Sequence, residues 1–149
     1  MKKLNLLVLA TGNQHKLLTT IKERGHTYEV YDPKSLYLYA SDNEKGFDQI
    51  AFGGKDLEEP IRLIAKNYDA VISRIGDAVE YGSCVLTHLT ENMGLYAPQT
   101  GSGLRVASNK LLTTQKLSSS GIRIPKTVTA YAPLHPKYLI DKVDRKSVV

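Results

Sequence analysis

The order of apolar segments along this chain of 149 residues predicts an α/β fold, with a mainly parallel sheet, flanking helices and a side β-hairpin. Two observations carry this prediction. Residues 4–10 and 70–72 are nearly continuous apolar runs, which is typical of strands covered on both faces of a parallel sheet. Segments with helical spacing separate the expected strands, and strands joined through helices lie parallel. The length fits one domain over residues 1–149.

Three strands of the main sheet are expected in the first half of the chain. Residues 4–10 lead into a helix for which Asn13 is the expected N-cap and Gly25 the stop. Residues 28–31 form the second strand, and residues 70–72 form the third. We expect the first strand to lie parallel to the other two, because helical connections with right-handed crossovers dominate such folds.

The segment between the second and third strands has a different character. Residues 49–52 and 55–57 are short alternating stretches on either side of Gly53 and Gly54. Two glycines between such stretches predict an antiparallel hairpin at the side of the main sheet. Residues 60–67 are expected to form a short helical or irregular link.

Helices dominate the second half of the sequence. The first ends at Gly94, and four of its side chains share one face: Val85, Leu86, Leu89 and Met93. Residues 96–98 are expected to form a short strand, and residues 104–119 a second helix. Three leucines of that helix are expected to contact the core: Leu111, Leu112 and Leu117. A strand over residues 128–131 and a helix over residues 136–143 follow.

Composition favours a cytoplasmic globular protein. Apolar residues are 42% and charged residues 23%, which is ordinary for that class. No apolar run approaches the ~20 residues of a membrane helix, and no signal-peptide cleavage pattern is found. The single cysteine, Cys84, fits a reducing compartment and is interpreted as a buried structural thiol. The net charge of +5 comes from scattered basic residues, so neither a membrane nor nucleic acid is an expected partner.

The turn after the first expected strand, Ala10-Thr11-Gly12-Asn13-Gln14-His15-Lys16, resembles the opening motif of the inosine triphosphate pyrophosphatases. Backbone donors at a helix N-terminus can bind phosphate. That family also requires carboxylates that hold magnesium and a second motif rich in Asp, Ser and Gly, and both are missing here. We interpret the turn as a polar cap of the first helix and keep nucleoside triphosphate pyrophosphatase as a weaker alternative.

Other common sites are absent from the sequence. The stretch 101–103, Gly-Ser-Gly, lacks the Gly-Lys-Ser/Thr ending of a phosphate-binding loop. The four histidines show no metal-ligand spacing, and the single cysteine adds no pair: His15, His26, His88 and His135. No metal site and no hydrolase nucleophile can be assigned.

A series of short peptides covers most of residues 20–149. They are Arg24-Gly25-His26, Asp32-Pro33 with Ser35 and Tyr37, Arg74-Ile75-Gly76, Tyr81-Gly82, Gly94, Asn109-Lys110-Leu111 and Gly121-Ile122 with Pro125. In this order the chain resembles the N-terminal, pre-ATP-grasp domain of the RimK-type ATP-grasp ligases. That family of ribosomal protein modification enzymes adds glutamate to the C-terminus of a ribosomal protein. The resemblance implies a small Rossmann-like domain beside a catalytic cleft.

The resemblance also implies candidate site residues. Lys110 matches the first of two family lysines that reach the nucleotide phosphates, and its alternative is a solvated surface lysine. Arg74 follows a central strand, where it could bind a substrate carboxylate in a bidentate fork. Its alternative is a local ion pair with Asp77. Two positions depart from the family: Gln99 stands where Asn is frequent, and Asn109 where Asp is frequent.

The function implied is that of an ATP-dependent carboxylate–amine ligase. ATP phosphorylates a carboxylate, and an amine such as that of glutamate attacks the acyl phosphate. ATP and Mg²⁺ would be bound mostly beyond Val149 by a further ATP-grasp domain, whose connection begins within residues 104–149. The acceptor would be a protein, such as a ribosomal protein, or a small molecule. We expect no catalytic residue in this chain, which would be inactive alone. The alternative is a stand-alone α/β binding or regulatory domain.

Overall fold

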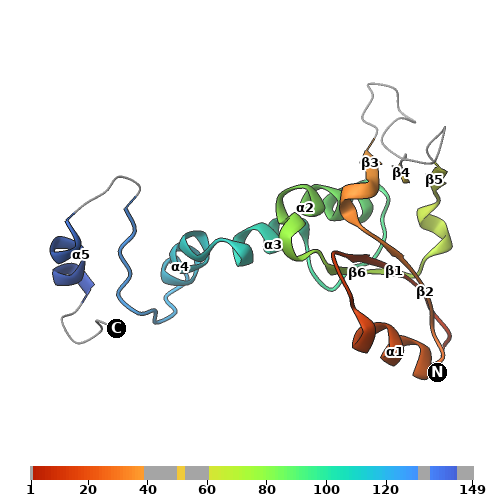
Figure 1. The fold of residues 1–149 in the computed structure, drawn as a ribbon, viewed down its shortest axis with the longest axis horizontal. Helices are drawn as coiled ribbons and strands as arrows, with labels where there is room; N and C mark the ends of the chain where they lie inside the picture. Colours follow the sequence, from red (N-terminus) through yellow and green to blue (C-terminus); the bar gives the residue numbers. More distant parts are fainter. Residues whose placement is uncertain (1, 39–49, 53–60, 131–134, 144–149) are drawn as a thin grey trace. The chain divides into compact units, whose positions relative to one another are not determined.

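A computed structural model describes residues 2–38, 50–52, 61–130 and 135–143 of the chain. The chain divides into two compact units, Met1–Arg105 and Val106–Val149, and each is described by itself. The main sheet and the helices that cover it belong to the first unit (Figure 1). The assignment of residues 1–149 to a single domain stays a prediction.

Three parallel strands form the main sheet: β1 (Asn5–Ala10), β2 (Thr27–Tyr31) and β6 (Ala70–Arg74). Their order is β2-β1-β6, so β1 lies in the centre. Val8 of β1 lies opposite Val30 on one side and Ile72 on the other. Both pairings are parallel, which confirms the prediction for the three strands.

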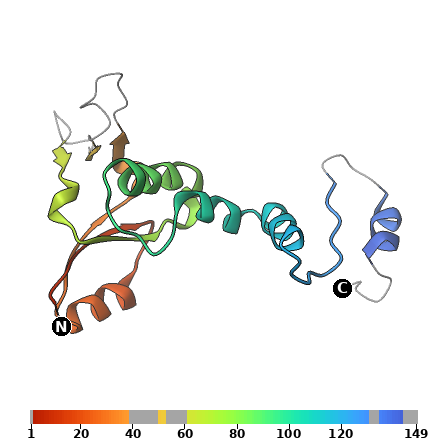
Figure 2. The same cartoon turned by 180° about the vertical axis from the view of Figure 1, so that it is seen from behind.

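Both faces of the sheet are covered at β1, as its apolar run predicted. Helix α1 (His15–Glu23) packs on one face, where Ile21 contacts the cluster that includes Leu6 and Val8. Helix α2 (Val79–Thr87) packs on the other face, in the cluster that includes Leu7 and Leu9. The two helices lie on opposite sides of the sheet in both views (Figures 1 and 2). Because neighbouring strand residues point to opposite faces, burial of consecutive residues requires this arrangement.

A small antiparallel sheet accompanies the parallel one. Its strands are β3 (Leu36–Leu38), β4 (Ile50–Phe52) and β5 (Ile61–Leu63), in the order β3-β4-β5. The predicted strand at 49–52 is therefore found as β4, while the turn at Gly53 and Gly54 and the strand at 55–57 lie outside the described residues.

The link predicted over residues 60–67 is wrong in its first part. Ile61–Leu63 is a strand, and only Ala65–Asn67 is helical, as the short 3₁₀ helix η3. The physical reason is burial: Leu63 is 3% exposed and belongs to the same cluster as Leu7 and Leu9. Pairing with β4 satisfies the backbone of this segment while its leucine enters the core.

The connection after β6 leads through a 3₁₀ turn, η4 (Gly76–Ala78), into α2 and then a π-helical turn, η5 (His88–Asn92). The predicted helix face is confirmed: Val85, Leu86 and Leu89 are buried and Met93 packs against them. Gly94 ends the helical segment with a φ of 70°, a left-handed conformation that glycine adopts freely. Residues 96–98 form no strand, although the Val71 N–H donates to the Tyr96 carbonyl at 2.8 Å.

The predicted helix over 104–119 is two helices, α3 (Gly101–Ser108) and α4 (Lys110–Ser119). Asn109 separates them, because its backbone is extended and its side chain accepts a hydrogen bond from the Leu112 N–H as an N-cap. The three leucines expected in the core are exposed instead: Leu111 41%, Leu112 44% and Leu117 37%.

The end of the chain gives mixed outcomes. The helix expected over residues 136–143 is confirmed as α5 (Pro136–Val143). Residues 128–130 form no strand, and Tyr131 lies outside the described residues. Cys84 is half-buried rather than fully buried, and its Sγ accepts a hydrogen bond from the Arg105 guanidinium at 2.7 Å. Within the described parts of the chain, no helix has the length and apolar character needed to cross a bilayer.

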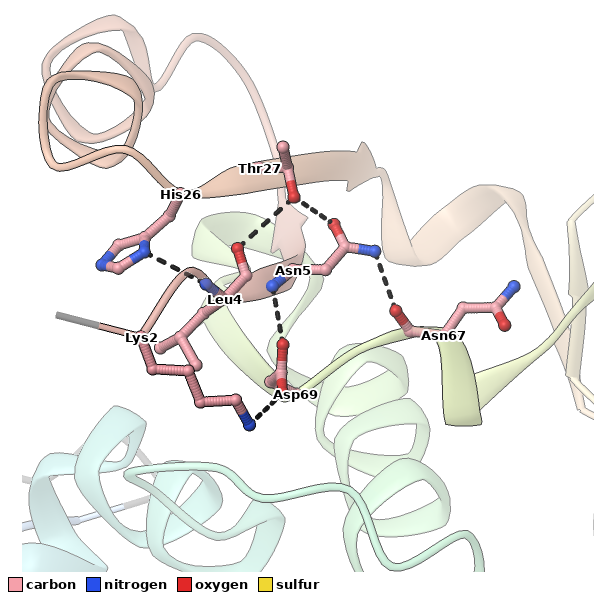
Figure 3. Close-up of polar contacts among 7 residues, drawn as sticks. All are labelled: Lys2, Leu4, Asn5, His26, Thr27, Asn67 and Asp69. Atoms are coloured by element: carbon pink, nitrogen blue, oxygen red, sulfur yellow. Dashed lines mark hydrogen bonds and ion pairs between the residues drawn. The ribbon is translucent and has the colours of Figure 1, made fainter.

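A polar network ties together the amino ends of the three parallel strands (Figure 3). The Asp69 carboxylate accepts from the Asn5 N–H at 2.7 Å and pairs with the Lys2 ammonium at 3.3 Å. The Leu4 N–H donates to Nδ1 of His26 at 3.2 Å. These contacts join the segments before β6, β1 and β2, so this edge of the sheet serves the fold.

Candidate functional site

The carboxyl ends of the parallel strands form the opposite edge of the sheet. There β1 continues toward α1 on one face, whereas β6 continues toward α2 on the other (Figures 1 and 2). Such a divergence between neighbouring strands is where open α/β sheets bind ligands. Arg74 is the last residue of β6, lies opposite Ala10 of β1, and is exposed. Arg74 thus lies at the carboxyl end of a parallel strand, as expected, but β6 is an outer strand of the three, so the expectation that Arg74 follows a central strand is wrong.

The loops that follow β1 and β6 approach each other closely. The Thr11 N–H donates to the Arg74 carbonyl at 3.2 Å, and Ile75 is 2% exposed in the core. Gly76 has a φ of 39°, and a Cβ at this position would lie 2.6 Å from the Thr11 hydroxyl oxygen. A side chain at residue 76 would therefore both strain the backbone and separate the loops. The backbone that carries Arg74 is fixed while its side chain faces solvent.

Asp77 in this loop pairs with Lys34 from η1 (Pro33–Ser35), the short helix that follows β2. The Lys34 Nζ lies 2.7 Å from Asp77 Oδ2, and the two side chains are 55% and 69% exposed. The Lys34 ammonium, and after it the Thr11 hydroxyl, hold the pKa of Asp77 below its ordinary value. The same pair raises the pKa of Lys34.

This pairing bears on the alternative reading of Arg74 as an arginine tied to Asp77. The carboxylate is occupied by Lys34, and none of the described residues forms an ion pair with Arg74. An exposed guanidinium at the strand end can therefore offer its planar set of donors to a carboxylate ligand. The assignment of Arg74 as a substrate-binding residue remains a prediction, and this geometry is compatible with it.

A second contact fixes the other side of β6. The Gln99 side-chain amide donates to the Ser73 carbonyl at 3.0 Å and to the Ser73 hydroxyl at 2.7 Å. Ser73 is 6% exposed, so these bonds are partly shielded from water. The segment before α3 is thereby held beside the residue that precedes Arg74. A glutamine offers the same amide donor as an asparagine and reaches one methylene further.

Sequence reasoning missed the contributions of Lys34 and Ser73. Both lie near the carboxyl ends of the predicted strands 28–31 and 70–72, and that position is the signal that could have found them. Their partners, Asp77 and Gln99, are 43 and 26 residues away along the chain. Contacts across such separations require the strand order, which periodicity alone does not give.

Lys110 is the first residue of α4 and is exposed. Asn109 before it caps the helix by accepting from the Leu112 N–H at 3.1 Å. Lys110 belongs to the second unit and Arg74 to the first, and each unit is described by itself. Both the phosphate-binding and the solvated interpretation of Lys110 stay predictions.

Mg²⁺ would need a group of ligands that the described residues do not gather in one place. Across residues 2–38, 50–52, 61–130 and 135–143, no group of three or more His, Cys, Asp and Glu side chains could hold a metal ion. Two side chains of the turn Ala10–Lys16 bond to its own backbone: the Asn13 side chain accepts from the His15 N–H at 2.9 Å, and the Gln14 amide donates to the Thr11 carbonyl at 3.3 Å. These contacts make a polar turn at the start of α1, but Gln14 is the N-cap residue, so the expectation of Asn13 at that position is wrong.

Comparison with known proteins places these features in context. The family described as RimK PreATP-grasp domain matches residues 4–104. The probable alpha-L-glutamate ligase of Alkalilimnicola ehrlichii is 31% identical over 94% of this chain and 44% of its own length. The probable alpha-L-glutamate ligase 2 of Shewanella frigidimarina is 34% identical over 94% of this chain and 45% of its own. A probable alpha-L-glutamate ligase of Xanthomonas oryzae pv. oryzae is 36% identical over 76% of this chain and 35% of its own. The chain spans less than half the length of these relatives.

Proposed function

This chain belongs to the RimK PreATP-grasp domain family, and from that premise we propose that it is the N-terminal domain of an ATP-dependent carboxylate–amine ligase. Relatives named as probable alpha-L-glutamate ligases are more than twice as long as the part that this chain matches, which supports a further ATP-grasp domain beside it. The proposed reaction attaches glutamate, or a similar amino acid, to a protein C-terminus or a small acceptor. The lone cysteine supports a cytoplasmic location for this protein.

The observation that carries the proposal is the exposed Arg74 at the carboxyl end of β6. Its backbone is held by Thr11 and by the buried Ile75, so the guanidinium projects from a fixed point. A guanidinium binds a carboxylate through two parallel N–H···O bonds, and both the acceptor and glutamate carry carboxylates. We assign Arg74 the role of holding one substrate carboxylate in place.

ATP and Mg²⁺ supply the activation of a carboxylate as an acyl phosphate in this proposal, and residues outside this chain bind most of both. Lys110 is the proposed phosphate contact of this chain, because an ammonium acts on phosphate as a mobile point charge. The chain alone should therefore not catalyse. The stand-alone regulatory domain and the nucleoside triphosphate pyrophosphatase remain alternatives, the latter supported only by the turn Ala10–Lys16.

Two measurements test the proposal. The 149-residue chain, titrated with Mg-ATP in a calorimeter, should show no micromolar affinity, which would correspond to ~8 kcal/mol. Such affinity, or release of pyrophosphate from inosine triphosphate, would favour the turn Ala10–Lys16 as a phosphate site. In a longer ligase that contains this domain, Arg74→Lys should raise the KM of the acceptor or glutamate and leave that of ATP nearly unchanged, because lysine lacks the planar fork. Equal kinetic constants for the two proteins would refute the role of Arg74.

A further inference from the structure

The ion pair between Lys34 and Asp77 connects loops at the outer strands of the parallel sheet. Lys34 follows β2 and Asp77 follows β6, and these strands lie on either side of β1. The pair therefore spans the end of the central strand, beside the loop that begins at Thr11. A pair this exposed contributes little to the stability of the fold.

Asp77 is also the acid that follows Arg74 in the same loop. Only Ile75 and Gly76 separate the two residues, and Ile75 is fixed in the core. An arginine binds a carboxylate more effectively than a lysine does, because it can donate two parallel hydrogen bonds. In this structure Asp77 nevertheless contacts Lys34 at 2.7 Å. Asp77 and Arg74 are thus close in the sequence, and the Asp77 carboxylate contacts the Lys34 ammonium.

We propose that Lys34 is a positioning residue that holds Asp77 away from Arg74, so that the Arg74 guanidinium stays available for a substrate carboxylate. This inference rests on the proposed function of Arg74 and adds a second residue to it. Without the Lys34 ammonium, Asp77 becomes an intramolecular competitor of the substrate. Asp77 is then a carboxylate at high effective concentration beside the guanidinium.

The other groups near the pair do not take over the role of Lys34. Asp32 accepts the Lys34 backbone N–H at 2.9 Å and so caps η1. The Thr11 hydroxyl interacts with Asp77 but carries no charge to balance it. Glu80, in the first turn of α2, is exposed and three residues beyond Asp77. Glu80 provides a matched control, because its removal changes the net charge as removal of Asp77 does.

The experiment titrates the 149-residue chain with tri-L-glutamate at low ionic strength, and follows the Kd by NMR. Arg74→Ala should abolish binding. Lys34→Met keeps the apolar stem and removes the charge, and it should raise the Kd about two- to five-fold, the range expected for an exposed ion pair. Lys34→Met with Asp77→Asn should restore the affinity, since the competitor is gone. Lys34→Met with Glu80→Gln restores the same net charge and should bind as weakly as Lys34→Met alone.

The outcomes separate this inference from the proposed function. Absence of binding to the unchanged chain, or binding that does not need Arg74, would overturn the role of Arg74 and the inference with it. Binding that needs Arg74 but is unaffected by Lys34→Met would overturn the inference alone. So would a double variant with Asp77→Asn that stays weak, which would show Lys34 itself touching the ligand. If Asp77→Asn and Glu80→Gln restored the affinity of Lys34→Met equally, the effect of Lys34 would be one of net charge, and the inference would be overturned. Lys2→Met, which breaks the Lys2–Asp69 pair at the other edge of the sheet, should leave the Kd unchanged.

Discussion

Replacement of Gly101 by alanine tests how α3 is held against α2. Gly101 is the first residue of α3 and is buried. A Cβ built on it would lie 2.1 Å from the Thr87 hydroxyl oxygen and 2.4 Å from the Ser83 carbonyl oxygen. Rotation of the threonine could relieve the first contact. The second is with backbone and lies about 1 Å below ordinary van der Waals distance, so α3 itself would have to move.

The magnitude follows from that overlap. Forcing an additional carbon into a packed contact costs about 1–3 kcal/mol. Alanine also favours the helix over glycine by up to ~1 kcal/mol, which offsets a part of the cost. We therefore expect Gly101→Ala to lower the free energy of unfolding by roughly 1–2 kcal/mol. For a unit of this size the melting temperature should fall by about 4–8 °C per kcal/mol.

Gly103→Ala in the same helix is the control. A Cβ at residue 103 would meet only the Thr100 hydroxyl oxygen, at 3.0 Å, and the site is exposed. The free energy of unfolding of this variant should be unchanged or up to about 1 kcal/mol higher, because alanine has a higher helix propensity than glycine. Urea denaturation followed by circular dichroism gives the midpoint of each variant. The midpoints report stability directly if the dependence of the unfolding free energy on urea is the same for both. If Gly101→Ala were as stable as Gly103→Ala, the close approach of α3 to α2 would be refuted.

The remaining predictions concern the candidate phosphate lysine, the acid side of the stability curve and two kinds of leucine. In a longer ligase, Lys110→Ala should raise the KM for ATP about ten-fold to a hundred-fold, because a charge-assisted hydrogen bond contributes roughly 1.5–3 kcal/mol; a lower melting temperature with unchanged kinetics would make Lys110 structural. The hydrogen bond from the Asn5 N–H is the chief cause that holds the pKa of Asp69 below its ordinary value in the folded protein. The ionised Asp69 therefore stabilises the fold above pH ~3.9, the pKa of aspartate in an unfolded chain, and this contribution is lost as the pH falls through the lower pKa of the folded state. Asp69→Asn should thus lower the free energy of unfolding at pH 7 and make it fall less steeply in acid. Curves of unfolding free energy against pH that run parallel for the variant and the unchanged protein would contradict this. Leu86→Ala should cost about 2–5 kcal/mol, whereas Leu112→Ala should cost less than about 1 kcal/mol, as denaturation midpoints would show.

Periodicity predicted the parts of the fold that are determined by burial on both sides. The run in β1 required two covered faces, and the structure places α1 and α2 there. The same reasoning failed for α4. Leu111 and Leu112 are adjacent, so they point about 100° apart on a helix and cannot share one narrow face. Apolar spacing also does not tell which element covers a helix, and in α4 all three leucines remain exposed.

Local chemistry decided two further differences. An asparagine can cap a helix as well as continue one, and the Asn109 side chain accepts a hydrogen bond from the Leu112 N–H. The helix expected across residue 109 is therefore interrupted there. Ile61–Leu63 was too short for a strand to be recognised against a helical link, and only the pairing with β4 shows it. In both places the sequence is compatible with two structures, and contacts select one.

The candidate site separates into a part that sequence can find and a part that it cannot. Arg74 follows a predicted strand, so its place at the carboxyl edge of the sheet comes directly from the order of elements. Lys34 and Asp77 form the same kind of pair as Lys2 and Asp69 at the opposite edge. By residue type the two pairs are equivalent. They differ in their neighbours. Asp77 is three residues beyond an exposed arginine that has no ion-pair partner among the described residues, whereas Asp69 accepts a hydrogen bond from the backbone N–H of Asn5 at the start of β1. The chemistry of a surface ion pair is therefore decided by the group next to it, which is why substitution of Lys34, and not of Lys2, should change the binding of a carboxylate.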